Sequence, residues 1–309
     1  LNQFIVCQGF ANAGMRSVLL GAVLNIILDP IFIFGYCGEA LSGTTGAAVA
    51  TVIGQFCGAG MTLYFNTRKN PDIQISFKGF RPSAKAIGRI YTVGLPSIAM
   101  QCVGSLMTFG MNLILMAFSA TAVAVFGVYF KLQSFIFMPV FGLTNAMVPI
   151  VAYNFGARKP ARIQKCIVLS CICAFLFMLC GFAVFQITPE LLLAMFHPTD
   201  TFLSMGSQAL RIISWGFPIA SFCVVLSAVF QALGIGLYAT IVSLARQLLV
   251  LLPVAYLLSL SNRLELVWWS FPVAELVCII VTLFFFCRVY RKKLRPISEA
   301  SVSGTPGRP

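Results

Sequence analysis

Long apolar runs separated by short polar connectors fill most of this 309-residue chain. Each run has about 20 residues or more, the length that an α-helix needs to cross the hydrocarbon core of a bilayer. The pattern predicts eight complete membrane-spanning helices, preceded by the last turns of another. The predicted spans are 17–35, 46–66, 90–117, 122–153, 166–187, 206–232, 238–260 and 266–287.

Composition indicates the same class of protein. Hydrophobic residues make up 59% of the chain and charged residues only 9%, whereas a soluble domain carries roughly a quarter charged residues. We therefore predict an all-α polytopic membrane protein. The span 122–153 exceeds the length of a straight crossing, so we expect it to be kinked at Pro139 and Pro149.

The net charge of +13 is concentrated in a few connectors and after the last span. Connectors rich in Lys and Arg lie on the cytoplasmic side of membrane proteins, which predicts that Arg16, the connector 67–89 and Arg288 are cytoplasmic. The basic tail 289–309 is rich in Ser, Gly and Pro and is predicted to be disordered. No basic stripe with interleaved aromatic residues is present, so nucleic acid is not an expected partner.

The eleven cysteines and the single histidine form no recognisable metal or catalytic motif. Most of the cysteines lie within apolar spans and lack the spacing of a zinc site or a disulfide framework, so they are interpreted as small buried hydrophobic residues. His197 lies in a turn-like loop. A membrane-embedded enzyme would need such groups clustered at one depth, so no catalytic residue is predicted.

The stretch Asn25-Ile-Ile-Leu-Asp29-Pro30 lies inside the first complete span. A helix places Asn25 and Asp29 on one face, and a carboxylate near the middle of a membrane helix costs roughly 2.5–3.5 kcal/mol. Pro30 donates no hydrogen bond, which frees the carbonyl of Ile26. These groups could hold a proton or a small cation such as Na⁺. A buried Asp that only specifies helix packing is the alternative.

Four more charged residues fall inside the spans. Lys131 could extend outward from the interface or face the protein interior. Glu275 and Arg211 lie near predicted outer ends, where pairing or solvation is expected. Arg246 is predicted to lie near an inner end, following the positive-inside pattern.

A weak internal repeat indicates a two-part architecture. Gly9 is followed by an apolar run that reaches Asp29-Pro30. Gly234 is followed by a similar run that reaches Leu252-Pro253, with Leu252 in the place of the acid.

Several of these segments, in this order, resemble the multidrug and toxic-compound extrusion (MATE) family. The resemblance covers nearly the whole chain except the tail, and the Asn-x-x-Leu-Asp-Pro stretch is its most specific part. The matching segments are 21–34, the 46–51 sequence Gly-Ala-Ala-Val-Ala-Thr, the Gly94-Leu-Pro96 start of a span, the 130–139 segment Phe-Lys-Leu-Gln-Ser-Phe-Ile-Phe-Met-Pro, and the 154–157 segment Asn-Phe-Gly-Ala.

The resemblance implies a two-lobe fold of twelve helices, with a cleft that opens alternately to either side of the membrane. This chain would then be a fragment that lacks the first three to four helices. Residues 1–66 would be the remnant of an incomplete N-terminal lobe, 67–89 the linker between lobes, and 90–288 the C-terminal lobe.

The resemblance also implies a function and a set of site residues. The protein would export lipophilic or cationic compounds in exchange for H⁺ or Na⁺, without a cofactor, as a monomer in the bacterial cytoplasmic membrane, in contact with membrane lipid. The family's coupling site would correspond here to Asp29, Asn25 and Thr51. Its first-helix Asp is absent from this chain. The substrate-cleft candidates are Lys131, Gln101, Gln133 and Met138.

Two other functions stay open on sequence grounds. A flippase or exporter of lipid-linked or other cell-envelope substrates could use a related two-lobe fold, because a broad lipophilic cleft serves either role. A purely structural membrane protein is a further class, but it would not need Asn25 and Asp29 stacked beside a proline.

Overall fold

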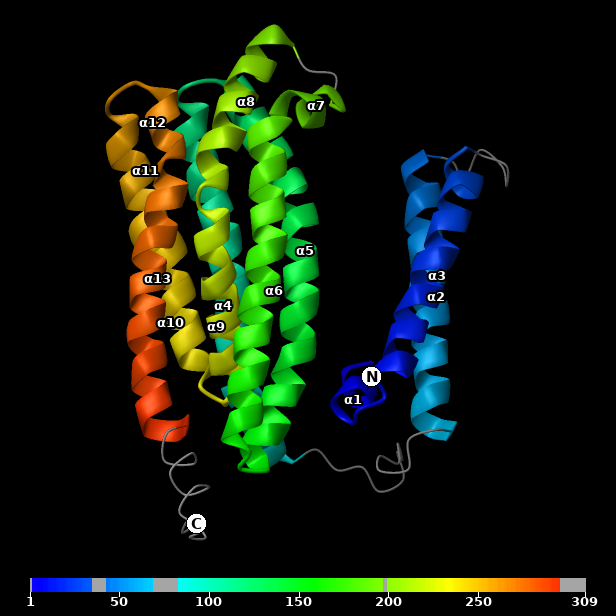
Figure 1. Ribbon diagram of the computed structural model, residues 1–309. Coiled ribbons are helices and arrows are strands. Elements are labelled where there is room, and N and C mark those ends of the chain that lie inside the picture. Colours follow the sequence, from blue (N-terminus) through cyan, green and yellow to red (C-terminus); the bar gives the residue numbers. More distant parts are fainter. Residues whose placement is uncertain (1, 35–42, 69–82, 197–198, 295–309) are drawn as a thin grey trace. The chain divides into compact units, whose positions relative to one another are not determined.

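The computed structural model describes residues 2–34, 43–68, 83–196 and 199–294. These residues form helices and no β-strand. The chain divides into two compact units, Leu1–Ser83 and Ala84–Pro309, which are shown in Figure 1. The division falls within the predicted linker 67–89. Most of that linker, the tail from 295 onward and His197 lie outside the described residues.

The first unit consists of a short helix and two long antiparallel ones. They are α1 (Asn2–Cys7), α2 (Ala11–Ile33) and α3 (Gly43–Arg68). Helices α2 and α3 lie side by side along their length (Figure 1). Both match spans that the apolar pattern predicts, although α2 begins earlier than expected.

Glycines allow the backbones of α2 and α3 to come into direct contact. A Cβ atom built on Gly54 would lie 2.7 Å from the carbonyl oxygen of Gly21, and one built on Gly21 would lie 2.9 Å from that of Gly54. A Cβ atom on Gly58 would lie 3.1 Å from the Ser17 carbonyl oxygen. Small residues that admit such close approach are typical of interfaces between membrane helices.

The second unit begins with three long helices. They are α4 (Ala84–Met116), α5 (Ala120–Gly156) and α6 (Pro160–Ile187). The Ser119 side chain caps α5 by accepting a hydrogen bond from the Ala122 N–H at 3.1 Å. Helix α5 is assigned as one continuous helix of 37 residues with Pro139 and Pro149 inside it.

The remaining spans of the second unit are interrupted. After the short α7 (Pro189–Ala194), α8 (Asp200–Ser214) and α9 (Phe217–Ala232) meet at a bend of 52°. Helix α10 (Gly236–Leu244) continues through a π-helical segment, η2 (Ala245–Leu251), into α11 (Leu252–Ser259). The last span comprises α12 (Leu264–Trp268), α13 (Ser270–Val289) and the π-helical η3 (Tyr290–Leu294).

The span predicted over 206–232 corresponds to this bent pair of helices. The break falls at Trp215 and Gly216, and a side chain from α6 satisfies the exposed end of α8. The Gln186 side-chain amide donates to the Arg211 carbonyl at 2.7 Å and to the Ser214 hydroxyl at 3.0 Å. Such partners are needed because the last turn of a helix leaves its carbonyls without helical donors.

The described residues contain seven helices that are long and apolar enough to cross a membrane, and an eighth span if the bent pair α8–α9 counts as one. This agrees with the eight predicted crossings and confirms an all-α polytopic membrane protein. In the second unit, the start of α8 and the turn that precedes α12 lie at one end, and the turns after α5 and α9 lie at the other (Figure 1).

Aromatic packing joins α5 to the last span in the core of the second unit. Phe126 stacks on Trp268 with ring centroids 6.5 Å apart. Tyr129 meets Phe271 edge-on at 5.8 Å. Phe126, Tyr129 and Trp268 are at most 2% exposed. In a membrane protein this close packing of side chains, rather than exclusion of water, holds the helices together.

The two turns of the proposed repeat share a backbone geometry. Gly9 and Gly234 both have positive φ, 91° and 71°. The Phe10 N–H bonds to the Ile5 carbonyl at 3.1 Å, and the Ile235 N–H bonds to the Phe230 carbonyl at 2.8 Å. The turn after α5 has the same closing bond, from Lys159 to Asn154 at 3.0 Å. The geometry is therefore not specific to the repeat, which stays a prediction.

Candidate functional site

Asn25 links the two long helices of the first unit through its side-chain amide. Its Nδ2 donates to Asp29 Oδ1 at 3.3 Å on the same helix and to Thr51 Oγ1 at 3.2 Å on α3. The Thr51 hydroxyl in turn donates to the Ala47 carbonyl at 2.9 Å. The structure therefore brings together all three residues that were singled out as the coupling site.

The glycine contact between α2 and α3 sets this arrangement. Asn25 is one helical turn beyond Gly21, and Thr51 is about one turn before Gly54, so both polar side chains lie beside the point of closest approach. A Cβ atom on Gly54 would lie only 3.5 Å from the Asn25 Cβ. Larger residues at these glycines would separate the helices and lengthen the Asn25–Thr51 hydrogen bond.

The Asp29 carboxylate has a neutral donor beside it. Asn25 and Asp29 are half-buried, and no basic side chain of the described residues forms an ion pair with Asp29. The side chains of Asp29, Asn25 and Thr51 carry oxygen atoms, the ligand type that hard cations prefer. This site can accept a proton on the carboxylate or a small cation among these oxygens.

The four cleft candidates lie on two helices of the second unit. Gln101 is exposed on α4, and the other three lie on α5. Lys131, Phe135 and Met138 follow each other at helical spacing on one exposed face, with Phe135 76% and Met138 67% exposed. Gln133 is half-buried on another side of α5. No hydrogen bond among the described residues joins the four candidates.

A second polar cluster lies inside the second unit. Arg246 Nη1 is 2.9 Å from Glu275 Oε1, and the two side chains are 27% and 15% exposed. Arg246 lies near the middle of the span Gly236–Ser259, so its assignment to the inner end of a helix is wrong. Opposite charges within apolar spans are expected to pair, but the sequence did not indicate which residues are partners.

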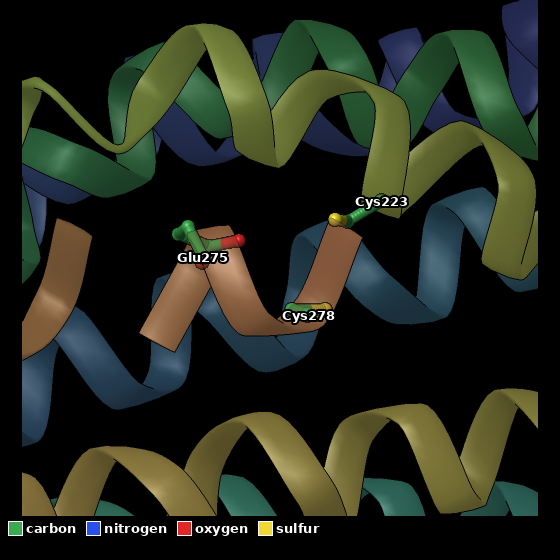
Figure 2. Close-up of side chains that lie close together, drawn as sticks. All are labelled: Cys223, Glu275 and Cys278. Carbon is green, nitrogen blue, oxygen red and sulfur yellow. The ribbon is translucent and has the colours of Figure 1, made fainter. Parts of the chain in front are cut away.

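Two thiols lie beside this ion pair. Cys223 projects from α9, whereas Cys278 and Glu275 are three residues apart on α13 (Figure 2). One donor atom from each of the three residues lies within 4.8 Å of the other two. This cluster could not be predicted from the sequence, because Cys223 is distant from the other two residues along the chain.

This chain is similar to a transporter family model and to curated multidrug export proteins. The MatE family model matches residues 96–257, about half of the chain. The multidrug export protein MepA of Staphylococcus aureus is 28% identical over 281 residues, which cover 90% of this chain and 60% of MepA. MepA of Staphylococcus saprophyticus is 29% identical over 279 residues, with the same coverage of both chains.

Solved structures of MATE transporters have the same fold. A MATE transporter in its straight conformation superposes with a TM-score of 0.85 at 24% identity, covering 96% of this chain and 66% of that one. An outward-facing multidrug resistance MATE family transporter gives a TM-score of 0.84 at 24% identity with the same coverage. The chain thus spans about three-fifths of the length of the curated relatives it matches.

These matches agree with the sequence resemblance and with the helical architecture. The apolar spans and the staphylococcal relatives identify an integral protein of a bacterial cytoplasmic membrane. The chain belongs to the MatE family of MATE transporters.

Proposed function

We propose that this protein is a secondary transporter that exports lipophilic, often cationic compounds in exchange for H⁺ or Na⁺. In this proposal, Asp29, Asn25 and Thr51 take up the coupling ion. The observation that carries it is the hydrogen-bonded chain from Asp29 through Asn25 to Thr51, which spans the contact between α2 and α3. The names of the staphylococcal relatives, which are multidrug export proteins, support the substrate class.

The Asp29 carboxylate would change its charge during the transport cycle. An unpaired negative charge within a membrane helix is unfavourable, and binding of H⁺ or Na⁺ removes it. Either ion would also displace the hydrogen bond that Asn25 Nδ2 donates to the carboxylate. A 180° rotation of the Asn25 amide would then turn its oxygen, rather than its nitrogen, toward the bound ion.

Rotation of the Asn25 amide would alter its bond to Thr51 on α3. Ion binding would thereby change a contact between two helices and not only the charge of one side chain. A ligand shifts a conformational equilibrium by the difference between its affinities for the two states. The coupling ion would therefore favour one conformation of the transporter if the Asn25–Thr51 contact differs between the inward- and outward-open states.

The exposed face of α5 is the proposed substrate-contacting surface. Methionine and aromatic side chains adapt to ligands of different shape, and Met138 and Phe135 lie together on this face. Lys131 is on the same face, and we propose that it contacts substrate there. Gln101, exposed on α4, and Gln133, on another side of α5, are the remaining cleft candidates. An unchanged transport rate in Lys131→Ala would instead indicate that this lysine extends to the membrane interface.

Ethidium efflux from cells that express the gene, with Na⁺ and pH gradients varied separately, tests the proposal. We expect Asp29→Asn to reduce gradient-dependent efflux to the level of cells without the gene, because an amide cannot exchange a proton or neutralise a cation. Asp200→Asn is the matched control, since Asp200 is an exposed acid in the first turn of α8. Normal efflux in Asp29→Asn would exclude this coupling site.

The unmodified protein separates the two candidate classes of transporter. Gradient-dependent ethidium efflux supports drug export, and the gradient that drives it identifies the coupling ion. Absence of dye efflux under both gradients, together with translocation of a lipid-linked sugar in reconstituted vesicles, would assign the protein to the flippase class instead.

A further inference from the structure

We propose that Cys223, Cys278 and Glu275 form a binding site for a thiophilic divalent metal ion of the Zn²⁺ and Cd²⁺ class. The site lies within the second unit and is separate from the Asp29 cluster of the first. Nothing in the proposed exchange of a drug for H⁺ or Na⁺ requires it.

The three donors have the spacing of a metal site that needs little rearrangement. Glu275 and Cys278 share one face of α13, and Cys223 faces them from α9 (Figure 2). Their donor atoms lie within 4.8 Å of one another. Ligands of tetrahedral zinc, with bonds of about 2.0–2.3 Å, are roughly 3.5–4 Å apart. Side-chain movement of about an ångström would therefore complete the geometry.

The Glu275 carboxylate has one oxygen available for a ligand. Oε1 is held by Arg246 at 2.9 Å, whereas Oε2 is buried and has no hydrogen-bond partner among the described residues. Buried polar atoms are normally satisfied, and an exception needs an explanation. A metal ion held by Oε2 and the two thiolates would supply the missing partner.

Charge balance favours a divalent ion. The Arg246–Glu275 pair is neutral as a unit, and both cysteines are buried, at 3% and 2% exposure. Binding of the ion displaces one proton from each thiol, so two thiolates cancel the two charges of the ion. The net charge of the cluster is unchanged, which matters because an excess charge inside a membrane is costly.

Sulfur ligands determine which metals fit. Thiolates select soft and borderline ions such as Zn²⁺, whereas Mg²⁺ and Ca²⁺ prefer sites made only of oxygen. Two thiolates and one carboxylate supply three protein ligands. A fourth position would be left to water or another small ligand, as in open zinc sites.

The surrounding helices are irregular where the cluster lies. Arg246 belongs to the π-helical segment η2, and such segments occur frequently at functional sites. Gly216, at the break between α8 and α9, leaves room for Glu275, because a Cβ atom there would lie 3.2 Å from the Glu275 Cγ. A metal ion would connect α9 and α13 next to this break.

Titration of the purified full chain in detergent with Cd²⁺ tests the site. We expect one tightly bound ion per chain and a thiolate-to-metal charge-transfer band in the ultraviolet, with no competition from Mg²⁺. Cys223→Ser and Cys278→Ser should each weaken binding by at least the roughly 10- to 100-fold that loss of an outer-shell partner costs in other metal sites. Cys180→Ser, at an exposed cysteine on α6, is the matched control and should bind like the unmodified chain.

X-ray absorption of the unmodified chain loaded with one equivalent of Zn²⁺ provides a test that needs no variant. The expected first shell contains two sulfur atoms at about 2.3 Å together with oxygen at about 2.0–2.2 Å. A first shell with fewer or more than two sulfur atoms would overturn the proposal. Unchanged Cd²⁺ affinity in folded Cys223→Ser and Cys278→Ser chains would overturn it as well.

Discussion

The two units each hold a carboxylate within a membrane span, but one carboxylate has a neutral partner and the other a positively charged partner. Asp29 in the first unit accepts a hydrogen bond from the neutral amide of Asn25 at 3.3 Å. Glu275 in the second unit pairs with Arg246 at 2.9 Å. The comparison distinguishes a carboxylate that has no basic partner among the described residues from one that is held in an ion pair.

The difference follows from what each carboxylate would lose on neutralisation. A proton or cation on Asp29 removes a charge that no basic side chain of the described residues compensates, so binding is not opposed by a broken ion pair within this part of the chain. Neutralising Glu275 would leave the Arg246 guanidinium without its counter-ion inside the membrane, which is costly. Coupling is therefore expected at Asp29, and a charge-neutral role, whether structural or as a metal ligand, at Glu275.

The largest expected loss of stability comes from breaking the ion pair between Arg246 and Glu275. Removal of one partner of a buried pair costs about 3–5 kcal/mol, and the partial exposure of Arg246 and Glu275 places Glu275→Gln toward the lower end. Asp29→Asn should change the free energy of unfolding far less, because no opposite charge is left behind. Thermal unfolding of the purified chain in detergent measures both.

A double substitution sharpens the same comparison. In Arg246→Gln together with Glu275→Gln, neither charge is left alone, so part of the lost stability should return. If Asp29→Asn destabilised the chain as much as Glu275→Gln does, the distinction between a switchable and a fixed charge would be wrong.

An intermediate loss of stability is expected from Gly54→Ala. The added methyl group would lie 2.7 Å from the Gly21 carbonyl oxygen, so α2 and α3 must move apart, at the roughly 1–3 kcal/mol typical of overpacking. Gradient-dependent ethidium efflux should fall as well, because separation of the two helices lengthens the Asn25–Thr51 hydrogen bond. Nothing lies within 4 Å of a Cβ atom built on Gly60 of the same helix. Gly60→Ala, the matched control, should therefore leave both stability and efflux unchanged.

The smallest expected effect on stability is that of Thr51→Val. This change removes the acceptor of the Asn25 hydrogen bond at 3.2 Å while keeping the shape of the side chain. Hydrogen bonds between membrane helices contribute about 0.6 kcal/mol on average. Thr67→Val is the control, since among the described residues the Thr67 hydroxyl bonds to carbonyls of its own helix and to no other helix. A double-mutant cycle between Asn25 and Thr51 measures the coupling, and a value of zero would show that the hydrogen bond contributes nothing.

The irregular spans of the second unit show where prediction from the sequence fails. Apolar periodicity reports the length of a span but not its continuity, since Gly216 and Pro218 are tolerated in many unbroken membrane helices. Helix α5 runs through Pro139 and Pro149 as one helix, and the kinks expected at these prolines stay a prediction. The π-helical segment η2 contains no proline or glycine itself. Pro253 follows it closely, but a proline does not by itself indicate a π-helical turn.

The sequence by itself determined the class of the protein, its eight crossings and the stacking of Asn25 on Asp29. These features depend on composition and on neighbours one helical turn apart, which helix geometry alone places together. Only the tertiary structure decided that Arg246 pairs with Glu275 and that Cys223 lies beside Cys278. Such contacts join separate helices, and they form only where glycines, helix breaks and complementary side chains let those helices pack.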